Sequence, residues 1–238
     1  MKSTVVLLHG FGEDASIWSG FVPFLQTEYF IITPDYSTQI FETIDEYALW
    51  LKEQLPSIEK STIIGHSMGG YIALAFAEKY PDMMQGLGLF HSSAFEDNEE
   101  KKEMRLKNIE FLAKHGTEAF IKNFTPNLYA DEFIANHPEV IQKHIAYSSK
   151  LPVNSLIAGM KAMLTRPDRR HVLEQADYPI LFVIGLQDKS VAPKDSLAQT
   201  KLTQKQPNLE LIQEIAHMGM VEEPFLTLQA VRLFLREI

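Results

Sequence analysis

Six short runs of apolar and β-branched residues limit the possible folds of this 238-residue chain more than any other feature. Most of them are continuously apolar, which is typical of strands buried on both faces of a parallel sheet. Parallel strands are joined by crossover segments, usually helices. We therefore predict an α/β fold with a mostly parallel sheet of about six strands flanked by helices, the strands lying at residues 5–8, 30–33, 61–64, 86–90, 180–184 and 209–212.

Three segments outside these runs have clear helical patterns. Thr43 and Glu46 have the spacing of a capping box, so a helix should begin there and end before Pro56. Residues 71–80 and 225–235 repeat apolar side chains at helical spacing. The last helix is expected to bury a stripe formed by Leu226, Ala230, Leu233 and Phe234.

Residues 96–172 differ from the rest of the chain. They have almost no strand pattern, and their charged amphipathic stretches are interrupted by a glycine and several prolines. About four helices inserted between two strands would give this pattern. We predict one α/β core, formed by residues 1–95 and 173–238, with a helical cap or lid formed by residues 96–172.

The charge balance argues against a nucleic-acid partner. The formal net charge is -9, from 31 acidic and 22 basic residues, and no block of Lys or Arg exceeds two neighbours. A surface that follows phosphates needs clustered basic residues. The partner is therefore expected to be a small molecule.

The chain has no cysteine, which excludes disulfides, thiol nucleophiles and metal sites built on cysteine. The apolar run at residues 5–8 is too short for the core of a signal peptide, and no stretch approaches the roughly 20 apolar residues of a membrane helix. We expect a cytoplasmic protein with no membrane association.

The clearest chemical motif is the run Gly-His-Ser-Met-Gly-Gly at residues 65–70. It contains Gly-x-Ser-x-Gly directly after a predicted strand and before a predicted helix, the context in which this motif presents a nucleophile. On so tight a turn, larger residues two positions either side of Ser67 would clash, which explains Gly65 and Gly69. The motif predicts Ser67 as a catalytic nucleophile.

A second motif, His-Gly-Phe-Gly at residues 9–12, follows the first predicted strand. Acyl transfer needs two hydrogen-bond donors aimed at the developing oxyanion. One should be the backbone N–H of Met68, directly after the nucleophile. The other is expected to be the N–H of Phe11, in a loop whose glycines allow close approach to a substrate.

Ser67 needs a base, because a serine hydroxyl is a weak nucleophile until a histidine takes its proton. His217 is our candidate, since its loop follows the last predicted strand and parallel sheets place their sites at such strand ends. His66 should point away from its neighbour Ser67. His9 is expected under the oxyanion loop, and His91 along the pocket. The remaining four histidines should lie on the surface: His115, His137, His144 and His171.

The acid should be a carboxylate at another strand end, between the serine and the histidine in sequence. Asp188 meets this condition, because it follows the strand at residues 180–184. Asp177 precedes that strand and should lie at the wrong end. The role expected of Asp188 is to orient the imidazole of His217 and to stabilise it when protonated.

With these motifs in this order, the chain resembles the α/β-hydrolase family, in particular its esterases and lactonases with a helical cap. The resemblance covers nearly the whole chain outside the cap, and the family fold implies that residues 96–172 cover the pocket and shape specificity. The chain departs from the family because it has no counterpart of the two strands that usually come before the His-Gly motif. The sheet should therefore have about six strands. Tyr36-Ser37-Thr38 replaces the family's usual Arg-Gly-His-Gly run, and Ala216 replaces the usual glycine before the histidine.

The predicted reaction is hydrolysis of a small or medium carboxylic ester or lactone through an acyl-enzyme, with no metal or cofactor. The pocket is expected to be mainly apolar. Outside the two glycine-containing motifs, the expected substrate-binding residues are Phe95, Phe120, Phe124 and Met163.

Two other functions agree with the same motifs. A carbon–carbon bond hydrolase, or a related synthase of menaquinone assembly, would use the same triad on a carboxylated substrate. It should then place an arginine in the pocket, and the candidates near the cap are Arg105, Arg166, Arg169 and Arg170. A ligand sensor or signalling protein with this fold would turn over little or no ester.

Overall fold

A six-stranded parallel sheet forms the centre of the computed structural model, which describes residues 2–56 and 60–238. The strand order is β2-β1-β3-β4-β5-β6, and every neighbouring pair is parallel. All six predicted strands are present, so the predicted fold class is confirmed. They are β1 (Thr4–Leu8), β2 (Phe30–Ile32), β3 (Ser61–His66), β4 (Met84–Phe90), β5 (Ile180–Gly185) and β6 (Asn208–Ile212).

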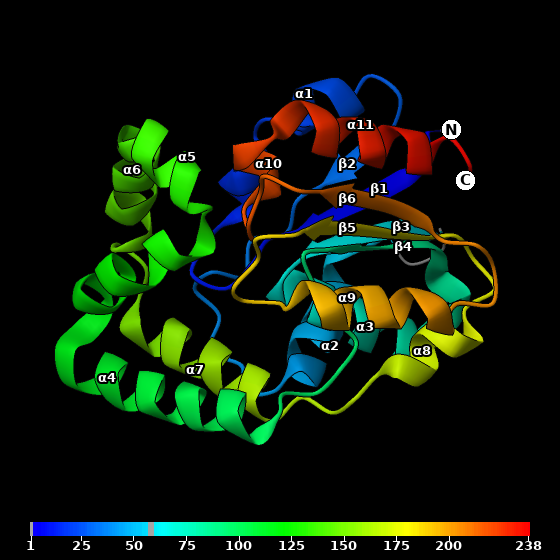
Figure 1. The fold of residues 1–238 in the computed structure, drawn as a ribbon. Helices are drawn as coiled ribbons and strands as arrows, with labels where there is room; N and C mark the ends of the chain where they lie inside the picture. Colours follow the sequence, from blue (N-terminus) through cyan, green and yellow to red (C-terminus); the bar gives the residue numbers. More distant parts are fainter. Residues whose placement is uncertain (1, 57–59) are drawn as a thin grey trace.

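Helices cover both faces of the sheet (Figure 1). One face carries α1 (Val22–Leu25) and α11 (Pro224–Leu235). The other carries α2 (Ile44–Gln54), α3 (Met68–Lys79), α8 (Arg170–Gln175) and α9 (Pro193–Gln199). Short turns complete this part of the chain: η1 (Ala15–Trp18), η2 (Pro81–Met83), η4 (Thr200–Leu202) and α10 (Gly219–Glu222).

The helix predicted from the capping box begins as expected. Thr43 is the N-cap of α2, its hydroxyl accepts the N–H of Glu46, and the Glu46 carboxylate accepts the N–H of Thr43 in return. The helix ends at Gln54, before Pro56. Local capping chemistry therefore determines where this helix starts.

The stripe predicted for the last helix is wrong at two of its four positions. α11 buries Ala230 and Phe234 as predicted, but Leu226 and Leu233 are exposed. Thr227 and Val231 take their places against the sheet. The helix is apolar on more than one side, so the spacing alone did not determine which side would be buried.

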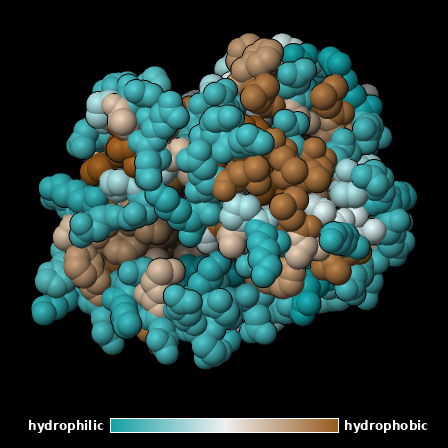
Figure 2. Space-filling view, in the orientation of Figure 1, coloured by the Kyte–Doolittle hydropathy of each residue, from teal (hydrophilic) through white to brown (hydrophobic). Residues whose placement is uncertain are grey.

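The two edge strands are less buried than a continuous apolar run predicts. Phe30 on β2 is exposed, as are Leu209 and Leu211 on β6, while the inner strands are buried along their lengths. Edge strands pack against fewer neighbours. In Figure 2 apolar side chains gather over β6, at the front edge of the sheet.

None of the described helices is both long and apolar enough to cross a membrane.

The chain between β4 and β5 forms helices that lie beside the sheet, on the left in Figure 1. The longest, α4 (Glu99–Phe124), bends at Gly116, whose φ of 77° is a conformation that glycine adopts readily. α4 packs along α7 (Val153–Leu164) and also contacts α6 (Pro138–Ser148). The remaining elements of this segment are η3 (Thr125–Leu128) and α5 (Asp131–Asn136).

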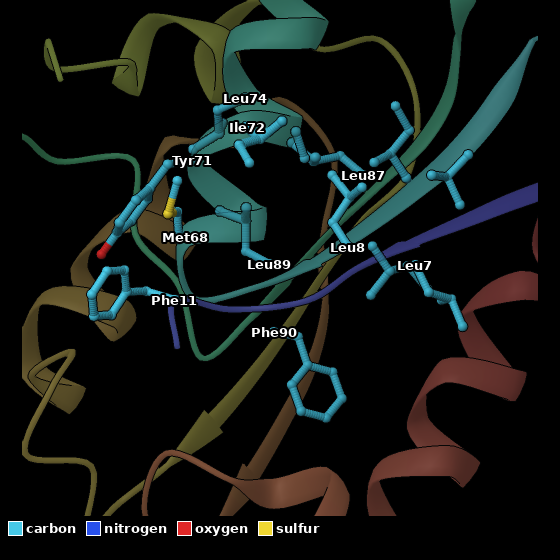
Figure 3. Packing of buried hydrophobic residues seen from close by; sticks show 14 of the residues in the cluster. Leu7, Leu8, Phe11, Met68, Tyr71, Ile72, Leu74, Leu87, Leu89 and Phe90 are labelled. Carbon is cyan, nitrogen blue, oxygen red and sulfur yellow. The ribbon is translucent and has the colours of Figure 1, made fainter. Parts of the chain in front are cut away.

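The main core lies between the sheet and its covering helices. Leu7, Leu8, Leu87 and Leu89 on the central strands are fully or almost fully buried. Figure 3 shows Phe11, Met68 and Tyr71 gathered at one end of this cluster. That end is the carboxyl edge of the sheet, where the motifs predicted from the sequence converge.

Candidate active site

Ser67 lies in the turn between β3 and α3 with φ 50° and ψ -115°, a backbone conformation that L-residues rarely adopt. Two contacts with the neighbouring strand hold the turn. The N–H of Ser67 donates to the carbonyl of Phe90 at 3.0 Å. The hydroxyl of Ser92 donates to the carbonyl of Ser67 at 2.7 Å. Strain of this kind persists where the surrounding structure enforces it.

The glycines around Ser67 are explained by close backbone contacts. A Cβ on Gly65 would lie 2.2 Å from the carbonyl carbon of Gly69, and a Cβ on Gly69 would lie 2.6 Å from the carbonyl oxygen of His9. The turn and the loop after β1 therefore approach more closely than a side chain allows.

Gly65→Ala is expected to destabilise the protein by at least about 3 kcal/mol, because the new methyl group meets backbone that cannot rotate away. Gly20→Ala is the matched control, since nothing lies within 4 Å of its Cβ position. It should change stability by no more than about 0.5 kcal/mol. Urea unfolding of both variants measures the difference, and equal stabilities would contradict this account of the turn.

Asp188 and His217 come from loops after β5 and β6 and meet at the same edge of the sheet. Asp188 Oδ2 lies 2.7 Å from His217 Nδ1, and the two side chains are only 2% and 3% exposed. This leaves the Nε2 side of the imidazole for a second partner. A histidine oriented by a buried carboxylate is suited to accept a proton at that nitrogen.

The carboxylate of Asp188 is held by its own loop. Its Oδ1 accepts hydrogen bonds from the N–H groups of Ser190 at 2.8 Å and Val191 at 2.9 Å. Burial raises the pKa of Asp188, but the charge and hydrogen bond of His217 outweigh it, so the pKa lies below its ordinary value. The group is therefore an acceptor at neutral pH.

Glu222 fixes the loop that carries His217. Its carboxylate accepts the N–H groups of Ala216 at 3.1 Å and Met218 at 3.0 Å, on either side of the histidine. It also accepts the N–H of Ala130, from the segment between β4 and β5, at 2.8 Å. The sequence drew attention to Glu222 only as part of the run after His217. Its role in orienting that loop depends on a turn that the sequence does not specify.

Ser67 and His217 line one cavity. In the described part of the chain, no hydrogen bond joins the Ser67 hydroxyl to the imidazole. Such bonds are often long in unliganded enzymes and tighten when substrate binds. The arrangement therefore brings the three predicted side chains to one place and leaves the serine–histidine contact open.

The two expected oxyanion donors also lie at this edge. Met68 is the first residue of α3, so its N–H has no acceptor within the helix, and the positive end of the helix dipole lies there. Phe11 lies in the loop after β1 and lines the same cavity as Ser67. The loop is fixed by the N–H of Gly10, which donates to Glu13 at 2.8 Å.

The cavity has a volume of about 370 Å³. Of the four predicted substrate-binding residues, Phe120, Phe124 and Met163 line it. Phe95 does not line the cavity; the Arg170 guanidinium lies 5.0 Å from its ring centre. The prediction that Phe95 lines the cavity is therefore wrong, because its ring packs against the Arg170 guanidinium instead.

Aromatic packing shapes one wall of the cavity. Phe11 meets Phe120 and Phe124 edge-on, with ring centres 6.2 Å and 5.7 Å apart, while Phe120 and Phe124 stack at 5.1 Å. The wall joins the loop after β1 to the end of α4. An apolar acyl or alcohol group would be in contact with these rings.

The other histidines are distributed differently from the prediction. His9 hydrogen-bonds to the carbonyl of Gly10 at 2.8 Å, in the loop where it was expected. His91 is fully buried behind the site, and its Nδ1 accepts the N–H of Gly185 at 3.2 Å, so it does not line the cavity. His144 is also buried, hydrogen-bonded to the hydroxyl of Tyr129 at 2.7 Å, so its surface placement was wrong.

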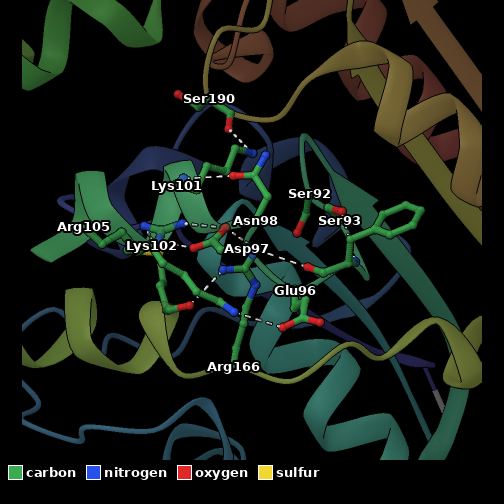
Figure 4. Close-up of polar contacts among 12 residues, drawn as sticks. Ser92, Ser93, Glu96, Asp97, Asn98, Lys101, Lys102, Arg105, Arg166 and Ser190 are labelled. Carbon is green, nitrogen blue, oxygen red and sulfur yellow. Dashed lines mark hydrogen bonds and ion pairs between the residues drawn. The ribbon is translucent and has the colours of Figure 1, made fainter.

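A buried charged cluster joins the start of α4 to the chain after α7 (Figure 4). Asp97 Oδ1 accepts from Arg166 Nη2 at 2.8 Å, and Asp97 also pairs with Arg105. Burial raises the pKa of Asp97, but the two guanidinium groups lower it from 3.8 to about 2. The cluster therefore holds both ends of the segment between β4 and β5 with ionised groups.

Asp97→Asn is expected to cost about 3 kcal/mol, because it leaves two largely buried guanidinium groups without their counter-charge. The pKa of Asp97 is lowered on folding, so its contribution is present above 3.8 and lost as the pH falls to about 2. As the pH falls from 3.8 to about 2, the free energy of unfolding of Asp97→Asn should therefore decrease less than that of the wild type. Glu99→Gln, which removes an exposed pair with Lys102, is the control and should change stability little. Equal stability of Asp97→Asn and wild type in urea would contradict the prediction.

Residues 2–56 and 60–238 contain no group of three or more His, Asp or Glu side chains placed to hold a metal ion.

Comparison with known proteins agrees with this geometry. The alpha/beta hydrolase fold family matches residues 3–224. The chain belongs to the α/β-hydrolase family. The resemblance seen in the motifs is confirmed, and the sheet of six parallel strands agrees with it.

Relatives within the α/β-hydrolases include esterases. The chain is 27% identical to a pimeloyl-[acyl-carrier protein] methyl ester esterase of Wigglesworthia glossinidia brevipalpis, over 98% of this chain and 93% of that protein. A thermophilic esterase from Thermogutta terrifontis, solved with malate bound, superposes with a TM-score of 0.90 at 30% identity, over 99% and 90% of the two chains. MenH from S. aureus shares the fold, with a TM-score of 0.87 at 20% identity over 99% and 94%.

Proposed function

We propose that this α/β-hydrolase is a serine esterase, cleaving a small or medium carboxylic ester or lactone through an acyl-enzyme. The observation that carries the proposal is the buried Asp188–His217 pair, 2.7 Å apart, on the same cavity as a serine in strained backbone geometry. Each part has a use in acyl transfer.

In the proposed reaction, Ser67 Oγ attacks the ester carbonyl carbon and His217 Nε2 takes the hydroxyl proton. The N–H groups of Phe11 and Met68 stabilise the negative oxygen of the tetrahedral intermediate. His217 then gives its proton to the leaving alcohol as the carbon–oxygen bond breaks. Water attacks the acyl-enzyme by the same steps, and Asp188 stabilises the imidazolium each time.

The cavity supports a substrate with apolar parts of modest size. Its volume of about 370 Å³ is at the small end of ligand sites, and much of its wall is aromatic or methionine. The relatives named as esterases agree with ester substrates. We further propose that residues 96–172 act as the cap, because Phe120, Phe124 and Met163 come from this segment.

The test is turnover by the wild-type protein on p-nitrophenyl esters with acyl chains of two to twelve carbons. We expect hydrolysis to be fastest on short and medium chains and to fall once the chain exceeds the cavity. If a fluorophosphonate labels the protein but no ester or lactone is turned over, the sensor function becomes the better explanation. If neither occurs, the esterase proposal is wrong.

One observation favours a second candidate, the hydrolysis or rearrangement of a carboxylated substrate. Arg105 lines the cavity, and its Nη1 faces the sulfurs of Met160 and Met163 at 3.6 Å and 3.4 Å, which are weak acceptors. The other three candidate arginines do not line the cavity and pair with acidic side chains, Arg166 with Asp97, Arg169 with Glu78 and Arg170 with Asp168. Arg105 also pairs with Asp97 through its Nε, but within the described residues its Nη1 has no acidic partner. A substrate carboxylate could therefore bind to Arg105.

Arg105→Gln separates the two candidates. If the natural substrate carries a carboxylate that binds Arg105, the variant should raise KM for the monoester of a dicarboxylic acid. The increase in KM for a neutral ester of the same length should be much smaller. Equal effects on both esters would eliminate the second candidate.

A further inference from the structure

A second acid–histidine pair lies beside the candidate active site, where Glu13 also lines the cavity, and has no part in the proposed proton transfers. Glu13 is 1% exposed and His66 is not exposed at all. Glu13 Oε2 accepts the N–H of Gly10 at 2.8 Å and lies 3.0 Å from His66 Nδ1. The pair therefore joins the loop that carries Phe11 to the strand that ends at His66, directly before Ser67.

The other nitrogen of His66 reaches a third element. His66 Nε2 lies 2.9 Å from the backbone carbonyl oxygen of His217. A carbonyl oxygen can only accept, so Nε2 must carry a proton. A carboxylate likewise only accepts, so His66 Nδ1 must carry a proton as well if Glu13 is ionised. Both contacts are then satisfied only by the imidazolium form of His66.

We infer that Glu13 and His66 form a buried ion pair in which His66 is protonated on both ring nitrogens. This pair positions three elements against one another: the oxyanion loop at residues 10–13, the turn of Ser67, and the loop of His217. Its effect on turnover rests on the proposed esterase function, but the protonation state of His66 does not.

The charges around the pair support this assignment. Burial raises the pKa of Glu13, but the charge and hydrogen bond of His66 outweigh it and lower the pKa from 4.5 to about 2. Burial lowers the pKa of His66, but the charge and hydrogen bond of Glu13 raise it above its ordinary 6.5. The proton therefore belongs on the histidine.

Other titratable groups face the pair from each element packed against it. Asp188 and the ring of His217 face His66 from the loops after β5 and β6, and the ring of His91 lies 6.1 Å from it at the end of β4. From α6, His144 and Tyr147 face Glu13, and Tyr36 from the loop after β2 and Tyr129 from the turn after η3 do so as well. His91 and His144 have pKa values lowered by burial, so Glu13 and Asp188 are the ionised neighbours at neutral pH.

The sign of the pH dependence follows from these directions. The pKa of His66 is raised on folding, so its stabilising contribution is complete below 6.5 and is lost as the pH rises through the folded value. The pKa of Glu13 is lowered, so its contribution is complete above 4.5 and is lost as the pH falls toward about 2. Between these limits the pair holds the three elements together.

The direct test is ¹⁵N NMR of the histidine side chains at pH 7.5, with the His66 signals assigned by their loss in His66→Asn. We expect both ring nitrogens of His66 to have the shifts of protonated nitrogens. In Glu13→Gln, which keeps the shape of the side chain, one of them should become unprotonated. A single protonated nitrogen in the wild type would overturn the inference whether or not the protein is an esterase, and it would do so even if the variant failed to fold.

Kinetics test the positioning role separately. Glu13→Gln should lower kcat on a short p-nitrophenyl ester by about tenfold or more and change KM little, because the reacting groups are displaced while the cavity is kept. Glu78→Gln is the matched control, since Glu78 faces His171 at 2.8 Å in a half-exposed pair far from the cavity, and it should leave kcat unchanged. An unchanged kcat in folded Glu13→Gln would overturn the positioning role.

Discussion

Ser67→Ala is expected to lower ester turnover by about a million-fold, to the rate given by the remaining binding groups alone. Ser67 lies on the cavity in a turn whose geometry is enforced by Phe90, Ser92 and the close approach of Gly65 and Gly69. The variant removes the attacking oxygen and leaves these contacts in place. Steady-state hydrolysis of a p-nitrophenyl ester measures the loss.

Ser93→Ala is the control for this variant. Ser93 lies at the same edge of the sheet, but its hydroxyl accepts the N–H of Phe95 and does not line the cavity. Its turnover should be close to that of the wild type. If Ser67→Ala kept more than about a thousandth of the activity, another residue would have to be the nucleophile.

Asp188→Asn is expected to lower kcat about ten-thousand-fold while the protein stays folded. Asp188 Oδ1 accepts two backbone N–H groups, from Ser190 and Val191, so an asparagine should keep its oxygen there and turn its NH₂ group toward His217. His217 Nδ1 must then accept, which moves the proton to Nε2. The imidazole would no longer be able to take the proton of Ser67.

Asp177→Asn is the matched control, because Asp177 precedes β5 while Asp188 follows it. It should leave kcat unchanged. A similar rate for Asp188→Asn and the wild type would show that the acid lies elsewhere. If kcat fell equally in Asp177→Asn, the loss would come from reduced stability of the fold. Thermal unfolding of both variants would then show lowered melting temperatures.

The sequence predicted the places of Ser67, Asp188 and His217 because each lies in the turn or loop after a predicted strand. The carboxyl ends of parallel strands meet at one edge of a sheet, so knowing the strands was enough to bring these residues together. The same reasoning located the loop of Phe11. These predictions depended on local pattern and on one rule of topology.

The cavity wall could not be predicted in the same way. Phe95 and Phe124 are both phenylalanines between β4 and β5, but only Phe124 lines the cavity. Phe124 is the last residue of α4, while Phe95 precedes that helix and packs against Arg170. His144 is buried for a related reason, since its partner Tyr129 comes from a different element. Long-range packing among helices leaves little signal in the sequence.

Glu13 shows the limit most clearly. An acidic residue in a glycine-containing loop has the pattern of an exposed turn. Glu13 is nevertheless buried, and its carboxylate hydrogen-bonds to the N–H of Gly10 and to the ring of His66. Its partner is 53 positions away along the chain. The contact becomes visible only when β1 and β3 are known to be neighbours.

Intact-protein mass spectrometry can test whether Ser67 is the nucleophile that forms a covalent acyl-enzyme. The wild type treated with a fluorophosphonate should gain the mass of one phosphonyl group, and peptide mapping should place it on Ser67. Ser67→Ala should gain none under the same conditions. An adduct on another residue, or an unmodified wild type that nevertheless hydrolyses esters, would contradict the account.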